Sequence, residues 1–365
     1  MDRILIIDTT HPVNTRTSRF KNTFSKFLTV TVCSWSRRTG PLKTIPGEYI
    51  YETNIGYGGK IKKLLHLPFF VLFCIKVFKK TRSEIIFASH WDSLICAVAI
   101  KFCCDRDVKI LYDCLDIPTA SSNHVLAAIR WIEKVNLKFV DLTIFASRYF
   151  KELYPPELKS FVFENHYSLN YLDEGKPPPA WLKNFDVTDL KSKKSVAWIG
   201  VVRYFDIIKN ILLSIKGESI YLYIFGDGPD LHRLVMAVED LGLSEQVIFF
   251  GRYQPEDLPI IYTLTDLVWA AYPTNDFNAV YAISNKFFEC SYFCKTPIFS
   301  KKTRMADDLM HNPNVILVDE YSIADIRSKL TKFSPTTDGK FVKYTPDTSW
   351  EKKETQFIEQ LRTVL

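Results

Sequence analysis

Three short segments in the second half of the chain carry residue types suited to binding a phosphate-bearing ligand. In the first, Gly226, Asp227 and Gly228 follow a strand predicted over 220–225 and precede a helix. Glycines at a strand end let the backbone and a helix N-terminus approach a ligand, at the carboxyl edge where open α/β sheets bind ligands. A tight turn that needs a positive φ would explain the same glycines equally well.

The second segment supplies positive charge. Gly200 and Arg203 follow the strand predicted from Ser195, and Lys209 lies six residues after Arg203. Two cations beside a helix start suit a diphosphate, because guanidinium and ammonium groups both neutralise phosphate oxygens. A structural Arg and a solvated Lys are the simpler interpretation of the same residues.

The third segment begins with polar residues and continues into an apolar helix. Ser284 is predicted to cap this helix, which would leave the N–H groups of Asn285 and Lys286 to an anion, with the helix dipole behind them. Glu289 lies one turn further on the same face. Alone it would be an ordinary solvated residue, but behind a phosphate site it can reach the two hydroxyls of a ribose.

Alternating apolar runs and helical patterns place these segments in the second of two α/β domains. Strands are predicted over 4–7, 29–33, 49–51, 85–88, 109–112 and 142–146, and again over 195–200, 220–225, 247–250, 267–270, 297–299 and 315–318. Helices lie between them, so each sheet is expected to be parallel and covered on both faces. Prolines interrupt the pattern at 154–156 and 175–179. The predicted organisation is a Rossmann-like domain over 1–168, a linker over 169–194, a second Rossmann-like domain over 195–345 and a terminal helical segment over 346–365.

Length and composition agree with a globular protein of two domains. Single cores stop growing at roughly 250–300 residues, and this chain has 365, of which 47% are hydrophobic and 24% charged. The eight cysteines form no Cys-x-x-Cys pair, no secretory signal opens the sequence, and no apolar run reaches the ~18 residues of a spanning helix. The expected location is therefore the cytoplasm.

The three segments, in this order, resemble the donor site of the retaining GT-B glycosyltransferases of family 4. The matching motifs are Gly-x-x-Arg with a following Lys, the FGDGP turn and the NKFFE helix. Weaker matches are Glu164-Asn165, where the family enters its second domain, and Ser349-Trp350-Glu351, which opens a terminal helix that crosses back to the first. The implied fold is α/β with GT-B architecture, two Rossmann-like domains facing a central cleft.

The resemblance assigns roles to the residues of the three segments. Arg203 and Lys209 would neutralise the diphosphate of a UDP- or GDP-sugar donor. Residues Ser284 to Lys286 would cap its distal phosphate, and Glu289 would hold the ribose. The implied reaction retains the anomeric configuration without a protein nucleophile.

One residue of the first domain is also implicated. The segment IIFASHWD over 85–92 matches the family's strand end and makes His90 the residue expected at the transferred sugar, with a hydrogen-bonded loop histidine as the alternative. No cofactor and no metal are expected. Asp105-Arg106-Asp107 has the Asp-x-Asp form of a metal-diphosphate site, but it falls between a helix and a strand at the wrong edge of the sheet and is interpreted as a solvated turn.

Two departures from the family bear on the donor sugar. The position eight residues before Glu289 holds Tyr281 where the family has a carboxylate, and the segment Cys290–Pro297 lacks the family's glycine. The expected function is sugar transfer to a glycan or lipid-linked acceptor in polysaccharide biosynthesis, with no nucleic-acid partner. The alternatives are a sugar-nucleotide 2-epimerase-like enzyme and a non-catalytic donor-binding subunit of a polysaccharide-assembly complex.

An anionic membrane surface is a further expected partner. Residues 1–165 carry a net charge of +9 and residues 166–365 a net charge of −3. In the first half an apolar, Phe-rich run over 64–73 is too short to span a bilayer but has the composition of an interfacial segment. Its flanking cations are Lys60, Lys62, Lys63, Lys76, Lys79, Lys80 and Arg82. If the segment lies in the interface, we expect the protein to attach peripherally to the inner face of the membrane. The alternative is that the apolar face of this segment is buried in the core of the first domain.

Overall fold

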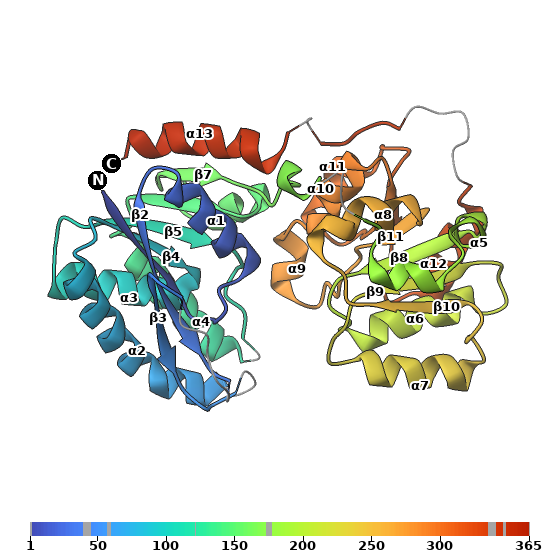
Figure 1. Cartoon of the computed structure of the whole chain (residues 1–365), viewed down its shortest axis with the longest axis horizontal. Coiled ribbons are helices and arrows are strands. Elements are labelled where there is room, and N and C mark those ends of the chain that lie inside the picture. Colours follow the sequence, from blue (N-terminus) through green and yellow to red (C-terminus); the bar gives the residue numbers. More distant parts are fainter. Residues whose placement is uncertain are drawn as a thin grey trace. The chain divides into compact units, whose positions relative to one another are not determined.

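The computed structural model describes residues 2–38, 45–56, 60–120, 122–172, 177–334, 341–345 and 348–364. The chain divides into two compact units, which Figure 1 draws. Unit 1 comprises residues 1–164 with 354–365, and unit 2 comprises residues 165–353. Residues 173–176, which include the start of the proline-rich stretch predicted to interrupt the pattern, lie outside the described residues.

Unit 1 is built on a seven-stranded parallel sheet with the order β3-β2-β1-β4-β5-β6-β7. The strands are β1 Arg3–Asp8, β2 Thr29–Ser36, β3 Glu48–Glu52, β4 Ile85–Ser89, β5 Lys109–Cys114, β6 Leu142–Phe145 and β7 Ser160–Val162. The helices are α1 Thr15–Ser25, α2 Lys60–Thr81, α3 His90–Cys103, α4 Asn123–Leu137 and the 3-10 helix η1 Arg148–Leu153. The apolar run of β1 is fully buried, as expected for a parallel strand covered on both faces.

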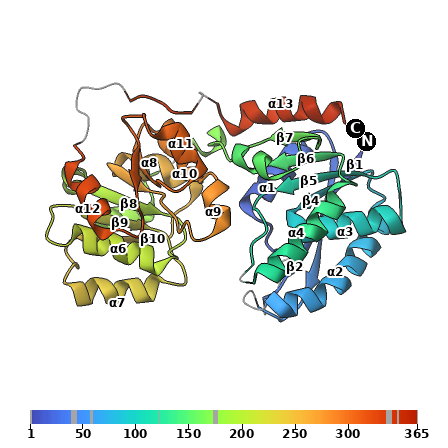
Figure 2. The same cartoon turned by 180° about the vertical axis from the view of Figure 1, so that it is seen from behind.

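Helices cover both faces of the first sheet. Phe20 of α1 packs against Phe87 of β4, with ring centroids 5.0 Å apart. On the other face, Phe70 of α2 stacks on Trp35 of β2 at 5.3 Å, and α3 packs between α2 and α4 (Figure 2). Because all strands are parallel, the residues that follow β1, β4 and β5 meet at one edge of the sheet.

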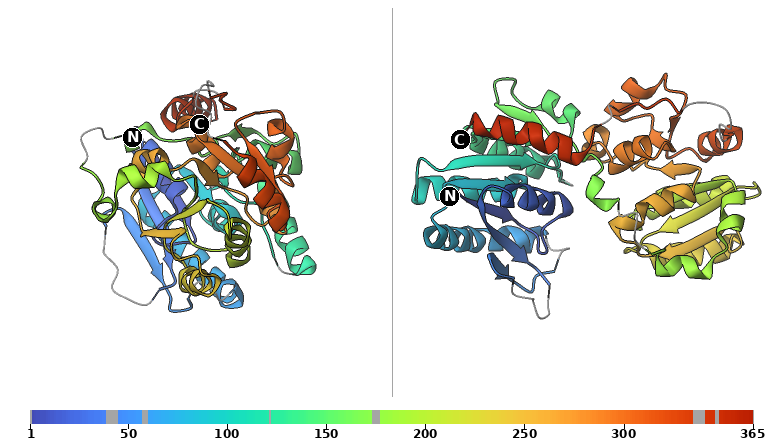
Figure 3. Two further views of the ribbon diagram at one scale, coloured as in Figure 1. Left: turned by 90° about the vertical axis from the view of Figure 1, so that its right-hand side faces the viewer. Right: turned by 45° about the horizontal axis from the view of Figure 1, so that its top comes forward.

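The last helix, α13 (Trp350–Arg362), contributes to unit 1 although it follows unit 2 in the sequence (Figure 3). Phe357 contacts Phe20 of α1 and Phe161 of β7, each at a centroid distance of 5.5 Å. Thr23 donates a hydrogen bond to Glu354 Oε1 at 2.6 Å. The apolar side of the amphipathic terminal helix therefore packs on aromatic side chains of unit 1.

Unit 2 is built on a six-stranded parallel sheet with the order β10-β9-β8-β11-β12-β13. The strands are β8 Ser195–Ile199, β9 Tyr221–Phe225, β10 Val247–Gly251, β11 Leu267–Trp269, β12 Thr296–Ser300 and β13 Ile316–Val318. The helices are α5 Val187–Ser192, α6 Phe205–Ile215, α7 Leu231–Leu241, α8 Leu258–Thr263, α9 Phe277–Tyr281, α10 Asn285–Tyr292, α11 Arg304–Leu309 and α12 Ile323–Lys332. Short 3-10 helices are η2 Leu169–Tyr171, η3 Ala180–Asn184 and η4 Pro255–Asp257.

The sequence of strand β8 is a continuous apolar run because both faces of the strand are buried. Val196 and Trp198 join the core formed with α6, α7 and α12. Ala197 and Ile199 join a second core on the opposite face, which includes residues of α5, α8 and α10. The predicted α/β fold with two covered parallel sheets is therefore confirmed.

The segment predicted as a linker contains regular structure. It holds η2, η3 and α5, and Asp186 caps α5 by accepting from the N–H of Thr188 at 2.8 Å. Trp181 lies against Phe225 and Phe250 of the second sheet, with centroid distances of 5.5 and 5.4 Å. Much of this segment is thus packed on unit 2.

Candidate functional site

The loops that follow β8 and β9 pack directly on each other at the carboxyl edge of the second sheet. The N–H of Gly200 donates to the carbonyl of Phe225 at 2.9 Å, and the N–H of Val202 donates to the carbonyl of Asp227 at 3.0 Å. The N–H of Gly226 donates in turn to Gly251, at the end of β10, at 2.7 Å. Three strand ends are thereby locked together by their backbones.

Two of the glycines predicted at a ligand are required by this packing. A Cβ atom on Gly226 would lie 1.8 Å from the carbonyl oxygen of Gly200, and one on Gly228 would lie 2.3 Å from that of Val202. Gly226 also has a φ of 145°. Gly200 differs, because its φ is 137° but its Cβ would meet nothing within 4 Å. The close approach that Gly226 and Gly228 allow is that of a neighbouring loop.

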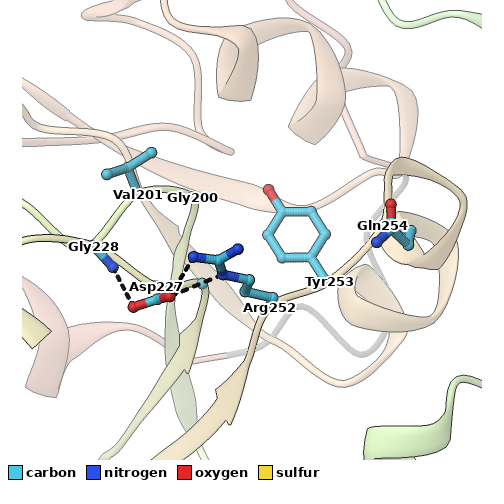
Figure 4. Close-up of a pocket in the computed structure, with 8 residues that line it drawn as sticks. Gly200, Val201, Asp227, Gly228, Arg252, Tyr253 and Gln254 are labelled. Carbon is cyan, nitrogen blue, oxygen red and sulfur yellow. Dashed lines mark hydrogen bonds and ion pairs between the residues drawn. The ribbon is translucent and has the colours of Figure 1, made fainter. Parts of the chain in front are cut away.

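These loops form the floor of a pocket of about 600 Å³, drawn in Figure 4. Its lining residues are Gly200, Val201, Gly226, Asp227, Gly228, Arg252, Tyr253 and Gln254. Arg252 turns back to Asp227, and its Nε donates to Asp227 Oδ2 at 2.8 Å. This hydrogen bond, with a second from the N–H of Gly228, lowers the pKa of the Asp227 carboxyl. The pocket therefore has an ionic pair on its rim and the ring of Tyr253 beside it.

The three residues after β10 were not predicted from the sequence. Arg252, Tyr253 and Gln254 follow the strand predicted over 247–250 and lie beside the Gly226 loop. The rule that ligands bind at the carboxyl ends of parallel strands could have found them. Burial raises the pKa of the Tyr253 hydroxyl; the nearby charge of Lys286 acts to lower this pKa and that of Glu289 to raise it, so both are electrostatic neighbours of Tyr253. The pocket and the start of α10 thus belong to one region of unit 2.

The two predicted phosphate cations lie on the surface near the start of α6. Arg203 is exposed, with its guanidinium 4.7 Å from the ring centroid of Tyr204, and Lys209 is exposed on the helix itself. Tyr204 holds the left-handed N-cap position of α6, with a φ of 66°. Within the part of the chain that the structure describes, neither cation forms an ion pair with a carboxylate. Both charges remain open to a solvent-borne anion.

The start of α10 agrees with the predicted cap but uses one of the amides expected to be free. Ser284 is the N-cap, and its Oγ accepts from the N–H of Lys286 at 3.2 Å. The carbonyl of Ser284 accepts from the N–H of Phe287 at 2.9 Å. The prediction that the Lys286 amide is free was therefore wrong, because the cap itself takes it. Of the two amides predicted to bind an anion, only that of Asn285 is left for this role.

The side chains of Lys286 and Glu289 form a buried ion pair. Their exposed fractions are 5% and 8%, and Lys286 Nζ donates to Glu289 Oε2. Tyr262 of α8 donates to the same oxygen at 2.7 Å. Burial alone would lower the pKa of Lys286, but the Glu289 carboxylate outweighs it, so that the pKa is raised and the ammonium stays charged.

In unit 1, the residue predicted at the transferred sugar has a strained backbone. His90 follows β4 as the first residue of α3, with a φ of 69°. Such a conformation costs a residue other than glycine roughly 1–3 kcal/mol and is concentrated at functional sites. Two buried carboxylates, Asp92 and Asp113, are electrostatic neighbours of His90. The carboxyl edge of the first sheet therefore also carries a polar cluster.

The two carboxylates have different cationic partners. Burial alone would raise the pKa of Asp92, but the charges of Lys63 and His90 outweigh burial, so the pKa of Asp92 is lowered. Asp92 Oδ2 accepts from Lys63 Nζ and, at 2.9 Å, from Thr9 Oγ1. Asp113 pairs with buried Arg16, whose Nε lies 3.0 Å from both carboxylate oxygens, yet burial dominates and the pKa of Asp113 is raised.

The Asp-x-Asp segment has the position expected from the sequence. It lies between the end of α3 at Cys103 and the start of β5 at Lys109, where the N–H of Asp107 donates to Asp105 Oδ1 at 2.9 Å. Asp105 and Asp107 are both exposed. Among the described residues, no group of three or more His, Cys, Asp or Glu side chains is arranged to hold a metal ion.

Helix α2, which contains the apolar run, exposes part of that run. Leu64, Leu65, Phe69 and Leu72 have exposed fractions of 63%, 67%, 58% and 63%. No helix in the described ranges is long and apolar enough to cross a membrane. Of the flanking cations, Lys63 is turned inward to Asp92, whereas Lys62, Lys76, Lys79 and Lys80 are exposed. The side chain of Lys60 lies outside the described residues.

Two Rossmann-like units with these parallel sheets define the two-domain GT-B fold. The structure is similar to sucrose-phosphate synthase from Thermosynechococcus elongatus, with a TM-score of 0.75, 13% identity and coverage of 100% of this chain and 99% of that one. It is also similar to Anabaena HepE in complex with UDP and glucose, with a TM-score of 0.67, 13% identity and coverage of 100% of both chains. A third similar structure is the lipopolysaccharide outer core galactosyltransferase WaaB, with a TM-score of 0.61, 15% identity and coverage of 100% of both chains. No protein-family model matches the sequence, and no curated protein matches it significantly.

Proposed function

We propose that this chain is a glycosyltransferase that moves a sugar from a nucleoside diphosphate sugar to a glycan or lipid-linked acceptor. The observation that carries the proposal is the pocket at the carboxyl ends of β8, β9 and β10. Arg203 and Lys209, in the loop and helix that follow β8, are exposed, and among the described residues neither forms an ion pair with a carboxylate. Anabaena HepE, which has the same fold, is described in complexes with UDP and with UDP-glucose. A UDP- or GDP-sugar is therefore the proposed donor.

The donor would use the pocket and α10 in the following way. Its base would lie in the pocket beside Tyr253, because a partly buried aromatic ring offers both apolar contact and a polar tip. Glu289 would accept from the ribose hydroxyls. The diphosphate would meet Arg203, Lys209 and the amide of Asn285 at the α10 N-terminus.

Catalysis in this proposal is mainly electrostatic. As the sugar leaves, negative charge develops on the diphosphate, and fixed cations stabilise that charge more than they stabilise the ground state. Arg203 and Lys209 are the residues proposed for this task. His90 is proposed to contact the transferred sugar, and attack from the face of the departing diphosphate would retain the anomeric configuration.

An anionic membrane is the proposed partner of unit 1, on the cytoplasmic face. In α2, residues 65, 69, 72, 76 and 79 recur with the spacing of one helix face, and all five are exposed. The first three are Leu65, Phe69 and Leu72, and the last two are lysines. An exposed apolar stripe that continues into cations fits a helix lying in the bilayer interface. A lipid-linked acceptor would be found at such a surface.

The experiment that tests the function follows a radiolabelled sugar. UDP- and GDP-sugars are incubated with the full chain and candidate glycan or lipid-linked acceptors, and label is traced to acceptor, to free sugar and to an epimerised nucleotide sugar. Transfer to an acceptor supports the proposal. Epimerised donor would establish the 2-epimerase-like alternative, and binding of donor without turnover would establish a non-catalytic subunit.

A further inference from the structure

The geometry points to Lys286 and Tyr262 as positioning residues that aim Glu289 at the donor ribose. Both donate to one carboxylate oxygen of Glu289, Oε2. The structure records no partner for Oε1 among the described residues. This inference rests on the proposed binding of a nucleoside diphosphate, and it gives Lys286 a role different from the phosphate contact that its sequence motif predicted.

Burial explains why Glu289 needs a fixed cation. An isolated buried carboxylate is costly, and in practice it takes up a proton unless a charged partner compensates it. Lys286 lies three residues earlier on α10, on the same face, and is as buried as Glu289. The amide of Lys286 serves the Ser284 cap, and its buried ammonium is turned to Glu289, so the structure directs Lys286 to the carboxylate and not to a phosphate.

Tyr262 holds the carboxylate from a second element. It lies on α8, and its fully buried ring stacks on Phe293 at 4.6 Å with an interplanar angle of 16°. A side chain held from both α8 and α10 has little rotational freedom. Oε1 is then the oxygen left to accept from the two adjacent hydroxyls of a ribose, which is the arrangement a preorganised site requires.

The ion pair also removes a repulsion. A bare carboxylate near the diphosphate site would oppose a ligand that carries negative charge, whereas the Lys286–Glu289 pair is neutral as a unit. The pair therefore presents a strong hydrogen-bond acceptor to the ribose without adding net negative charge beside the phosphates.

Calorimetry with paired nucleotides tests the inference. Kd is measured for UDP and for 2′,3′-dideoxy-UDP, and for the corresponding guanine nucleotides, and the ratio of the two Kd values reports the contribution of the hydroxyl pair. In the wild type we expect a ratio of roughly 10 to 100, since a hydrogen bond to a charged group contributes on the order of 1.5–3 kcal/mol. Glu289→Ala should bring the ratio close to 1.

Two variants then separate aiming from simple structural support. Lys286→Met should reduce the ratio nearly as far as Glu289→Ala does, and Tyr262→Phe, which keeps the ring and removes only the hydroxyl, should reduce it by about 3- to 10-fold. Lys329→Met, which removes an exposed lysine on α12, is the matched control and should leave the ratio unchanged. A structural role alone would weaken both nucleotides equally and keep the ratio constant.

The outcomes distinguish this inference from the function on which it rests. A ratio that survives Glu289→Ala would remove Glu289 from the ribose, and a wild type that binds none of the nucleotides would overturn the proposed function itself. A ratio lost in Glu289→Ala but kept in both Lys286→Met and Tyr262→Phe would overturn only the positioning role. If Lys286→Met fails to fold, Tyr262→Phe alone decides between these results.

Discussion

Gly226 and Gly200 touch so closely that a single added methyl group on Gly226 would lie 1.8 Å from the Gly200 carbonyl oxygen. The two residues end neighbouring strands, and the N–H of Gly200 donates to the carbonyl of Phe225 just before Gly226. The floor of the candidate nucleotide pocket therefore depends on the absence of a side chain at one position.

Gly226→Ala should lower the free energy of unfolding by roughly 2–4 kcal/mol, because the two loops must separate and the φ of 145° is strained for alanine. Gly217→Ala is the matched control: its φ is 82°, but a Cβ there meets nothing within 4 Å. It should cost only about 1–2 kcal/mol. Urea denaturation measures both, and equal losses would mean that the clash is relieved without cost.

Arg203→Ala and Lys209→Ala should each lower sugar transfer on the order of 10²-fold, as the loss of a preorganised charge at a developing anion does. Both side chains are exposed, so the melting temperature should stay within a degree or two of the wild type. Lys329→Ala serves as the control for removing an exposed lysine. Unchanged turnover in either variant would take that residue out of the diphosphate site.

Transfer should persist in EDTA. In the proposed site, Arg203, Lys209 and the α10 N-terminus would supply the positive charge that a divalent ion otherwise provides. Activity is measured with and without chelator and after addition of Mn²⁺ or Mg²⁺. Complete loss followed by restoration would contradict this expectation, and loss of the metal response in Asp105→Asn with Asp107→Asn would then locate the metal.

Cys294→Gly should stabilise unit 2. Cys294 follows α10 with a φ of 54°, in the segment where the resembled family carries a glycine. Relief of this conformation, less the entropy gained by the unfolded chain, should raise the free energy of unfolding by roughly 0.5–1 kcal/mol. Cys103→Gly, at the exposed end of α3, should instead destabilise by about 0.3 kcal/mol, because glycine is a poorer helix former than cysteine. A loss of stability in Cys294→Gly would refute the prediction.

The sheets could be predicted from the sequence because parallel strands buried on both faces are continuous apolar runs, as β1 and β8 are. The Ser284 cap could be predicted as well, since it depends only on neighbours in the chain. Contacts between distant residues could not. Lys63 and Asp92 lie 29 positions apart, and nothing in either local pattern marks the two as partners.

The same limit applies to the candidate site. The motif around Glu289 predicted the helix and its polar face, but Tyr262 reaches Glu289 from another helix, 27 positions earlier. The left-handed backbone of His90 could not be predicted either, because only a few per cent of residues other than glycine have a positive φ, and no neighbouring residue marks this one. Local pattern thus predicted the segments proposed to carry the site, while tertiary packing determined which of their groups are already bonded.

Charge reversal on α2 tests the membrane partner. Lys76→Glu with Lys79→Glu should reduce binding of the full chain to anionic vesicles by at least about tenfold, because each lysine near such a surface adds ~1 kcal/mol. Lys63 must be left intact, since it pairs with buried Asp92 and its loss would disturb the His90 region. Lys329→Glu with Lys332→Glu, on exposed positions of α12, is the matched control and should bind as the wild type does.

The apolar part of the stripe makes a separate contribution. Leu65→Ser with Phe69→Ser should weaken vesicle binding without the salt dependence that marks the lysines, because buried apolar area is insensitive to screening. Sedimentation with phosphatidylserine-containing and with pure phosphatidylcholine vesicles, at low and high salt, measures both effects. Wild-type binding should favour the anionic vesicles and fall as salt rises. Equal and negligible sedimentation with both lipids would leave the exposed face of α2 without a membrane role.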